Sequence, residues 1–148
     1  MAQPFHFEIN GAIYFITTRL KDIGFFLNKN EIEVIVETIR GLASSREMRL
    51  YAYVVMPNHF HVLIKPLRSE ISLLMQLIKG RSSRRINKGN LWQKGFFDFT
   101  IMTEEKFREK FNYIHYNPVK SGLVEKAEDY KFSSALWYKV KYGEAFYQ

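Results

Sequence analysis

Apolar and polar residues alternate in four segments of the chain and recur with a helical period in three others. The predicted strands are Gly11 to Arg19, Arg49 to Met56, His59 to Pro66 and Gly95 to Met102, and the predicted helices are Asn30 to Ala43, Ser69 to Asn87 and Thr103 to Tyr116. The first six elements follow the order β-α-β-β-α-β of a ferredoxin-like antiparallel sheet with its helices on one face. We therefore predict an α+β fold of this type, followed by a further helix and a C-terminal extension.

A pair of histidines opens the third predicted strand. Alternate strand residues share a face, so His59 and His61 point the same way, while Phe60, Val62 and Ile64 fall on the opposite, core-facing side. We expect both imidazoles to lie on a face that is left open. Two neutral imidazoles can bind a divalent ion and leave coordination positions for substrate oxygens. Histidines at this spacing are more often simply solvated, so the pair alone does not establish a metal site.

The last predicted helix begins at Thr103, a suitable N-cap residue, with two acidic residues in its first turn. Its apolar residues recur at i, i+4 and i+7 as Phe107, Phe111 and Ile114. This stripe is expected to face the core.

Tyr113 and Asn117 lie on a flank of that stripe, in the same sector as Lys106 and Lys110. Tyrosine can act as a covalent nucleophile, although an ordinary phenol has a pKa near 10 and needs a nearby base or cation. The alternative is that Tyr113 is an ordinary amphipathic aromatic at the edge of the helix, with a structural role only. Pro118 leaves it open whether Asn117 is still helical.

Three motifs give the chain a family resemblance. They are VVMPNHFHVLIKP at residues 54 to 66, LWQKGFFDFTI at 91 to 101 and YIHYNPVKSGLV at 113 to 124, with weaker similarity in YKFSSALWY at 130 to 138. In this order they resemble the HUH-type single-tyrosine transposases, and most closely the REP-associated tyrosine transposases of bacteria.

The resemblance implies roles for particular residues. His59 and His61 would be metal ligands for Mg²⁺ or Mn²⁺, Tyr113 the nucleophile, and Asn117 a further ligand on the same helix. Tyr116 is the rival nucleophile, but only Tyr113 has the family's spacing to the Asn-Pro pair. The implied reaction is nicking and joining of single-stranded DNA near hairpins through a 5′-phosphotyrosine, without ATP. Such relatives include dimers that complete each site in trans as well as monomers, so a homodimer stays open.

The chain also departs from the family pattern. Many relatives have an acid followed by a histidine after the tryptophan segment, whereas Phe99 follows Asp98 here. This leaves the target sequence open. The alternative function is a domesticated, noncatalytic protein that binds DNA or RNA hairpins, but the presence of both histidines, the tyrosine and Asn117 argues against it.

The charge of the chain agrees with a nucleic acid partner. There are 22 Lys plus Arg against 15 Asp plus Glu, giving a net charge of +7 and a pI near 9.6. The predicted DNA-binding residues are Arg19, Lys79, Arg81, Arg84, Arg85, Trp92, Lys94, Lys106 and Lys110, with Lys88 in the same cluster. The sequence is equally consistent with Trp92 stacking on an unpaired base and with Trp92 packing in the core. We expect Phe96 and Phe97 to pack in the core.

Composition limits the class of protein. The 148 residues are expected to form one catalytic domain, 1–148, with enough apolar residues for a core. No cysteine is present, which excludes disulfides, thiolate zinc sites and cysteine catalysis. No apolar run is long enough to span a bilayer, and Gln3, Pro4 and His6 interrupt any signal-peptide pattern, so we expect a cytoplasmic protein without a membrane partner.

Overall fold

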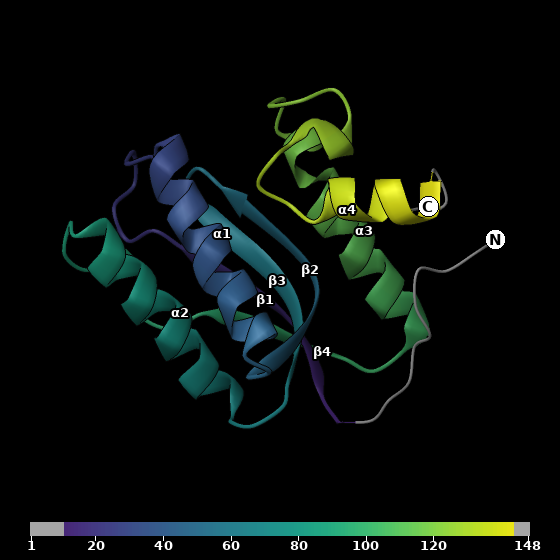
Figure 1. Cartoon of the computed structure of the whole chain (residues 1–148), viewed down its shortest axis with the longest axis horizontal. Coiled ribbons are helices and arrows are strands. Elements are labelled where there is room, and N and C mark those ends of the chain that lie inside the picture. The colour runs from purple at the N-terminus through teal and green to yellow at the C-terminus, as the bar shows by residue number, and fades with distance from the viewer. Residues whose placement is uncertain (1–10, 144–148) are drawn as a thin grey trace.

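The computed structural model describes residues 11–143, which form a four-stranded antiparallel sheet and the helices that pack on it (Figure 1). In chain order the elements are β1 (Ile13–Arg19), α1 (Lys29–Ser44), β2 (Met48–Met56), β3 (His59–Pro66), α2 (Ile71–Ile86), β4 (Phe97–Ile101), α3 (Glu104–Lys120), the 3₁₀ turn η1 (Ala127–Asp129) and α4 (Ala135–Tyr142). The strand order is β2-β3-β1-β4 and every neighbouring pair is antiparallel. The predicted ferredoxin-like α+β fold is confirmed.

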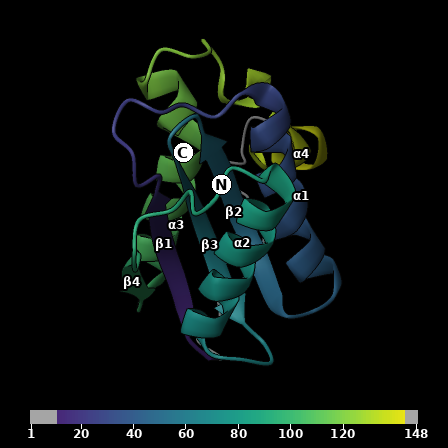
Figure 2. The ribbon, with the colours of Figure 1, turned by 90° about the vertical axis from the view of Figure 1, so that its left-hand side faces the viewer.

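Helices α1 and α2 cover one face of the sheet, and α3 lies on the other face (Figures 1 and 2). The residues of β3 alternate between these two layers. Phe60 is fully buried and its ring lies 5.2 Å from that of Trp92, whose indole nitrogen donates to Ser82 Oγ of α2. His61 turns to the opposite side, where its ring contacts that of Tyr113 on α3.

The face that carries the histidines is not open, which corrects the expectation from sequence. Helix α3 packs across β2 and β3, and His61 is only 2% exposed. The physical reason is the apolar stripe of α3: Phe107, Phe111 and Ile114 are all buried, and the sheet is the surface that buries them. The stripe was predicted correctly, but its consequence for the histidines was not.

Helix α3 begins as predicted and ends four residues later than predicted. Thr103 is the N-cap and its Oγ1 accepts a hydrogen bond from Lys106 N at 3.1 Å. Pro118 lies within the last turn of the helix, where it lacks the backbone N–H that would donate to the carbonyl of Ile114, and the helix nevertheless continues to Lys120. Asn117 is therefore helical, on the same rigid element as Tyr113.

The C-terminal extension covers the outer edge of β2. Val55 N donates to Phe132 O at 2.9 Å, and Ser134 N donates to Tyr53 O at 3.1 Å. The Tyr130 hydroxyl donates to Val55 O at 2.6 Å. An exposed sheet edge invites pairing with other chains, so these bonds protect β2 and fix the extension beside α3. Among the helices of residues 11–143, none is long and apolar enough to cross a membrane.

His115 joins α3 to this extension. It is fully buried, its Nε2 lies 2.6 Å from Ser134 Oγ, and its ring lies against those of Phe111 and Tyr138 at 4.5 and 5.5 Å. Burial, which disfavours the charged imidazolium, lowers the pKa of His115 from 6.5 to about 3. This histidine is therefore neutral in the folded protein and serves the packing of the fold.

We expect His115 to make the protein less stable in acid. Unfolding returns its pKa to about 6.5, so the unfolded chain binds one more proton at pH values between 3 and 6.5. The free energy of unfolding then falls as the pH is lowered from 6.5, by up to roughly 1.4 kcal/mol per pH unit for this group. Urea unfolding at about pH 7 and about pH 5 should show a weaker pH dependence for His115→Gln than for wild type. Equal pH dependence in the two proteins would contradict this role.

Candidate functional site

A cavity of about 400 Å³ lies between the C-terminal half of α3 and the turn that joins β2 to β3. Its lining includes four residues predicted as site residues: Arg19, His59, Tyr113 and Asn117. They come from three elements: Arg19 of β1 pairs with His59 of β3, and Tyr113 of α3 contacts His61 of β3 and Phe15 of β1. His61 lies next to this cavity, beneath the Tyr113 ring.

Both histidines are oriented by a hydrogen bond to Nδ1. His59 Nδ1 lies 2.7 Å from Asn58 Oδ1, and His61 Nδ1 lies 2.8 Å from Thr17 Oγ1. An amide oxygen only accepts, so Nδ1 of His59 carries the proton and its Nε2 carries the lone pair. The same tautomer suits His61, whose buried Nε2 has no hydrogen-bond partner among the described residues. Such outer hydrogen bonds are the usual way in which proteins orient histidine ligands for a metal ion.

The surroundings keep both imidazoles neutral. Burial, with a smaller contribution from the charge of Arg19, lowers the pKa of His59 to about 4. Burial, the neighbouring His59 and the cations Arg19 and Lys110 lower the pKa of His61 to about 3. Only a neutral imidazole has a lone pair to offer, so both side chains are in the protonation state that a metal ion requires at neutral pH.

Tyr113 lies against His61 of this pair. Its ring meets that of His61 edge-on at 5.3 Å and that of Phe15 at 5.8 Å, while the two histidine rings are 4.8 Å apart. Tyr113 nevertheless stays 42% exposed. Tyr116, the rival nucleophile, is also exposed but does not line the cavity. The arrangement gives Tyr113, and not Tyr116, the position beside the histidines.

The same side of α3 contributes Asn117 and Lys120, one and two turns beyond Tyr113. Sequence reasoning missed Lys120 because it ended the helix at Tyr116. Extending the helical period through Pro118 would have placed Lys120 at i+7 from the tyrosine and thus on its face.

The donor set fits a hard divalent ion bound by few protein groups. Within residues 11–143, no cluster of three or more His, Cys, Asp and Glu side chains could hold a metal. Two imidazole nitrogens and the Asn117 amide oxygen would leave several coordination positions for water and for phosphate oxygens. Mg²⁺ and Mn²⁺ prefer oxygen ligands, so water and the phosphate oxygens of a nucleic acid substrate would supply most of the coordination.

The two lysines predicted near the tyrosine differ in position. Lys110 Nζ lies 4.9 Å from the ring centroids of both Phe15 and Phe99, close enough to His61 to affect its pKa. Lys106 is paired with Glu109 at 2.9 Å on the exposed surface of α3. Lys110 therefore belongs to the site's surroundings and Lys106 lies outside them.

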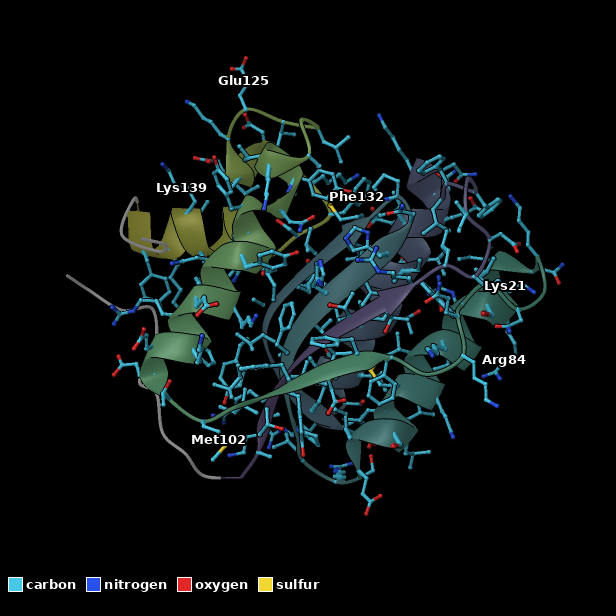
Figure 3. All side chains as sticks on the ribbon, turned by 180° about the vertical axis from the view of Figure 1, so that it is seen from behind. Lys21, Arg84, Met102, Glu125, Phe132 and Lys139 are labelled. Carbon is cyan, nitrogen blue, oxygen red and sulfur yellow. The ribbon has the colours of Figure 1, made fainter. Side chains whose placement is uncertain are left out.

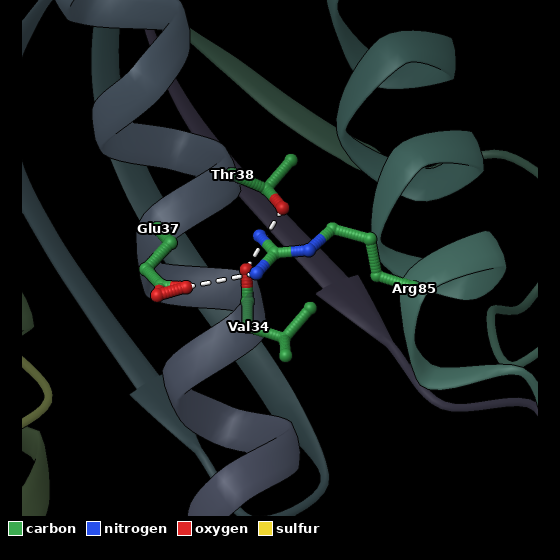
Figure 4. A network of polar contacts seen from close by, with 4 residues as sticks. All are labelled: Val34, Glu37, Thr38 and Arg85. Carbon is green, nitrogen blue, oxygen red and sulfur yellow. Dashed lines mark hydrogen bonds and ion pairs between the residues drawn. The ribbon is translucent and has the colours of Figure 1, made fainter.

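The basic cluster consists of Lys79, Arg81, Arg84 and Arg85 of α2 with Lys88 and Lys94 after it, and α2 lies on the face of the sheet opposite α3 (Figure 3 labels Arg84). Several of its cations have partners within the protein. Arg85 pairs with Glu37 of α1 at 2.9 Å (Figure 4), and Lys88 pairs with Glu31 at 2.8 Å. Lys79 donates to the carbonyl oxygens of Gln93 and Gly95. Among the described residues, Arg81, Arg84 and Lys94 are the exposed cations of this region that form no ion pair.

Two aromatic assignments are wrong. Trp92 is 1% exposed and packs against Phe60, so it cannot stack on a base as a DNA-binding residue. Trp92 forms an isolated β-bridge with Leu20, which places its side chain in the core beneath α2. Phe97, expected in the core, is 59% exposed on the outer strand β4.

Comparison with known proteins agrees with this geometry. The family model for IS200-like transposases matches residues 9–117. A REP-associated tyrosine transposase of Escherichia coli strain K12 is 26% identical over 136 residues, which are 90% of this chain and 82% of that protein. A solved structure of a REP-associated tyrosine transposase bound to a REP hairpin has a TM-score of 0.79 and 26% identity, and covers 97% of this chain and 87% of its own. These matches confirm the resemblance seen in the sequence motifs, and the chain belongs to the IS200-like transposase family.

Proposed function

We propose that this chain nicks and rejoins single-stranded DNA beside hairpins, with Tyr113 as the nucleophile. The observation that carries the proposal is the cavity in which Tyr113 lies against His61, with His59 and Asn117 in the same lining. Membership of a transposase family supports the class of reaction. No observation favours the noncatalytic alternative.

In the proposed reaction, the Tyr113 hydroxyl gives up its proton and its oxygen attacks a backbone phosphorus. The bond from phosphorus to the 3′-oxygen breaks, and that oxygen takes up a proton. The products are a 5′-phosphotyrosine and a free 3′-hydroxyl. A second strand's 3′-hydroxyl can then attack the phosphotyrosine, which releases the tyrosine and rejoins the DNA without an external energy source.

Residues around the tyrosine have separate tasks. Arg19 and Lys120 line the cavity and would offset the negative charge of the phosphate. His59, His61 and Asn117 would hold Mg²⁺ or Mn²⁺. When bound, such an ion would orient the scissile phosphate and lower the cost of the charge that develops on its oxygens.

We propose that the DNA extends from the cavity toward the basic cluster. Gln93 N donates to Arg19 O at 2.9 Å, and Lys21 N donates to Leu91 O at 2.9 Å. These bonds hold the segment that follows the basic cluster against the end of β1, the strand that carries Arg19 to the cavity. The solved structure of a relative bound to a REP hairpin supports a hairpin as the partner, and we propose that the hairpin stem contacts this basic surface. Such binding would weaken steeply as the salt concentration rises.

The test is a denaturing gel that detects a covalent protein–DNA adduct. The protein is incubated with end-labelled hairpin DNA that carries unpaired flanks, with Mn²⁺, with Mg²⁺ or with EDTA. We expect a metal-dependent adduct. Binding across a broad hairpin library with no adduct in any metal would refute the cleavage function.

The hydrogen bond between His61 Nδ1 and Thr17 Oγ1 gives a further prediction. Thr17→Val preserves the shape of the side chain but removes the oxygen that orients His61. We expect the Mn²⁺ concentration that supports half-maximal adduct formation to rise by about 10- to 100-fold.

Thr18→Val is the matched control for this change. Thr18 is the next residue of the same strand and is buried, and its Oγ1 has no hydrogen-bond partner among the described residues. We expect Thr18→Val to leave the metal requirement unchanged. A similar effect from both variants would show that the strand, and not the hydrogen bond to His61, is what matters.

A further inference from the structure

The cavity beside Tyr113 has a polar side and an apolar side. Arg19, His59 and Lys120 contribute to the polar side, while the apolar side includes Phe26 and Leu123. These two side chains are 62% and 48% exposed. Exposed apolar groups that meet at a cavity mark a surface that a ligand covers.

Phe26 is held in place by its loop, residues 20–28. Leu20 N donates to Asn58 O at 3.0 Å and Leu27 N donates to Pro57 O at 2.8 Å, so the loop is fastened to the turn that precedes His59. The neighbouring Phe25 is partly buried against the core and lies 5.7 Å beneath the ammonium of Lys88. With Phe25 turned toward the core, Phe26 is left to line the cavity.

Leu123 is held just as firmly at the end of α3. Leu123 N donates to Pro118 O at 2.9 Å, and Gly122 N donates to Val119 O at 3.0 Å. This bond pair, with Gly122 in the left-handed region at φ 82°, is a Schellman motif. The residue after such a glycine has a fixed direction, so the apolar side of the cavity is formed before any ligand binds.

We propose that Phe26 and Leu123 form a binding site for the unpaired base next to the scissile phosphate, with the Phe26 ring stacked on the base. The inference rests on the proposed function, because it takes the phosphate to lie at Arg19, His59 and Lys120. A nucleotide has the same division as the cavity, with a charged phosphate beside a flat, largely apolar base. The cavity of about 400 Å³ lies in the size range of small-molecule sites. Stacking accepts any base, so this site positions the strand and leaves sequence selection to other contacts.

The experiment uses the full chain with Tyr113→Phe, in EDTA, so that binding is measured without cleavage. The probe is hairpin DNA with unpaired flanks, in which 2-aminopurine replaces one flank base at a time. We expect stacking to quench the fluorescence at one or two adjacent positions. Adding Phe26→Ala should remove that quenching and weaken binding by roughly 5- to 150-fold.

Two controls make the result specific. Ile23→Ala changes another exposed apolar residue of the same loop that does not line the cavity, and it should leave quenching and affinity unchanged. DNA with an abasic site at the quenched position should bind equally well with and without Phe26→Ala. Quenching at no position, or an equal loss of affinity for intact and abasic DNA, would overturn the proposal.

The readout is separate from the cleavage reaction. If quenching depends on Phe26 but the wild-type protein forms no adduct, the base site stands and the proposed cleavage fails. If the wild-type protein forms the adduct but quenching does not depend on Phe26, the cleavage stands and the base site fails.

Discussion

Replacing Tyr113 with phenylalanine should abolish the covalent protein–DNA adduct and leave DNA binding nearly unchanged. Phenylalanine keeps the ring contacts with His61 and Phe15, so the site should retain its shape. Only the hydroxyl is lost, and a reaction that proceeds through a covalent intermediate cannot do without its nucleophile. We expect adduct formation to fall by more than about 1,000-fold. Affinity for hairpin DNA, measured by fluorescence anisotropy in EDTA, should stay within about twofold.

Tyr116→Phe is the matched control, because it makes the same chemical change three residues further along α3. Tyr116 is exposed to a similar degree but does not line the cavity. This variant should form the adduct at the wild-type rate. If Tyr113→Phe still formed the adduct and Tyr116→Phe did not, the nucleophile would have been assigned to the wrong tyrosine.

The fold could be predicted from the sequence because each strand and helix has its own hydrophobic pattern over a few consecutive residues. The alternation in β3 and the helical period of α3 each depend on a few consecutive residues, and β3 was predicted with its observed bounds, His59–Pro66. The shared side of Tyr113 and Asn117 also follows from local geometry. These two features defined the two halves of the candidate site, and the family resemblance joined them before any tertiary contact was known.

The remaining errors concern contacts between distant segments. The burial of His61 depends on α3 crossing the sheet, which no pattern within β3 could reveal. Trp92 is surrounded by basic residues in the sequence, yet a bridge to Leu20 draws it into the core. Phe26 was not singled out, because its place in the cavity arises from hydrogen bonds that tie its loop to the β2–β3 turn.

The proposed metal-binding role of His59 and His61 leads to a second prediction with a large expected effect. His59 is partly exposed, and His59→Ala should remove one Nε2 ligand while leaving the buried His61 in place. Loss of an orienting partner alone typically costs 10- to 100-fold in metal affinity, so loss of a ligand should raise the Mn²⁺ concentration for half-maximal adduct formation by more than about 100-fold. DNA binding in EDTA should be nearly unchanged, because His59 is neutral and contributes no charge toward the phosphates.

His61→Ala should have the same effect on the metal requirement and an additional one on stability. Its ring is buried between Phe15 and Tyr113, so truncation leaves a space and lowers the free energy of unfolding. His59→Ala therefore separates metal binding from folding, and His115→Gln controls for the loss of a histidine outside the cavity. If Mn²⁺ supported adduct formation equally well in wild type and His59→Ala, the histidine pair would not be the metal site. The neutral imidazoles would then serve only to pack Tyr113 against the sheet.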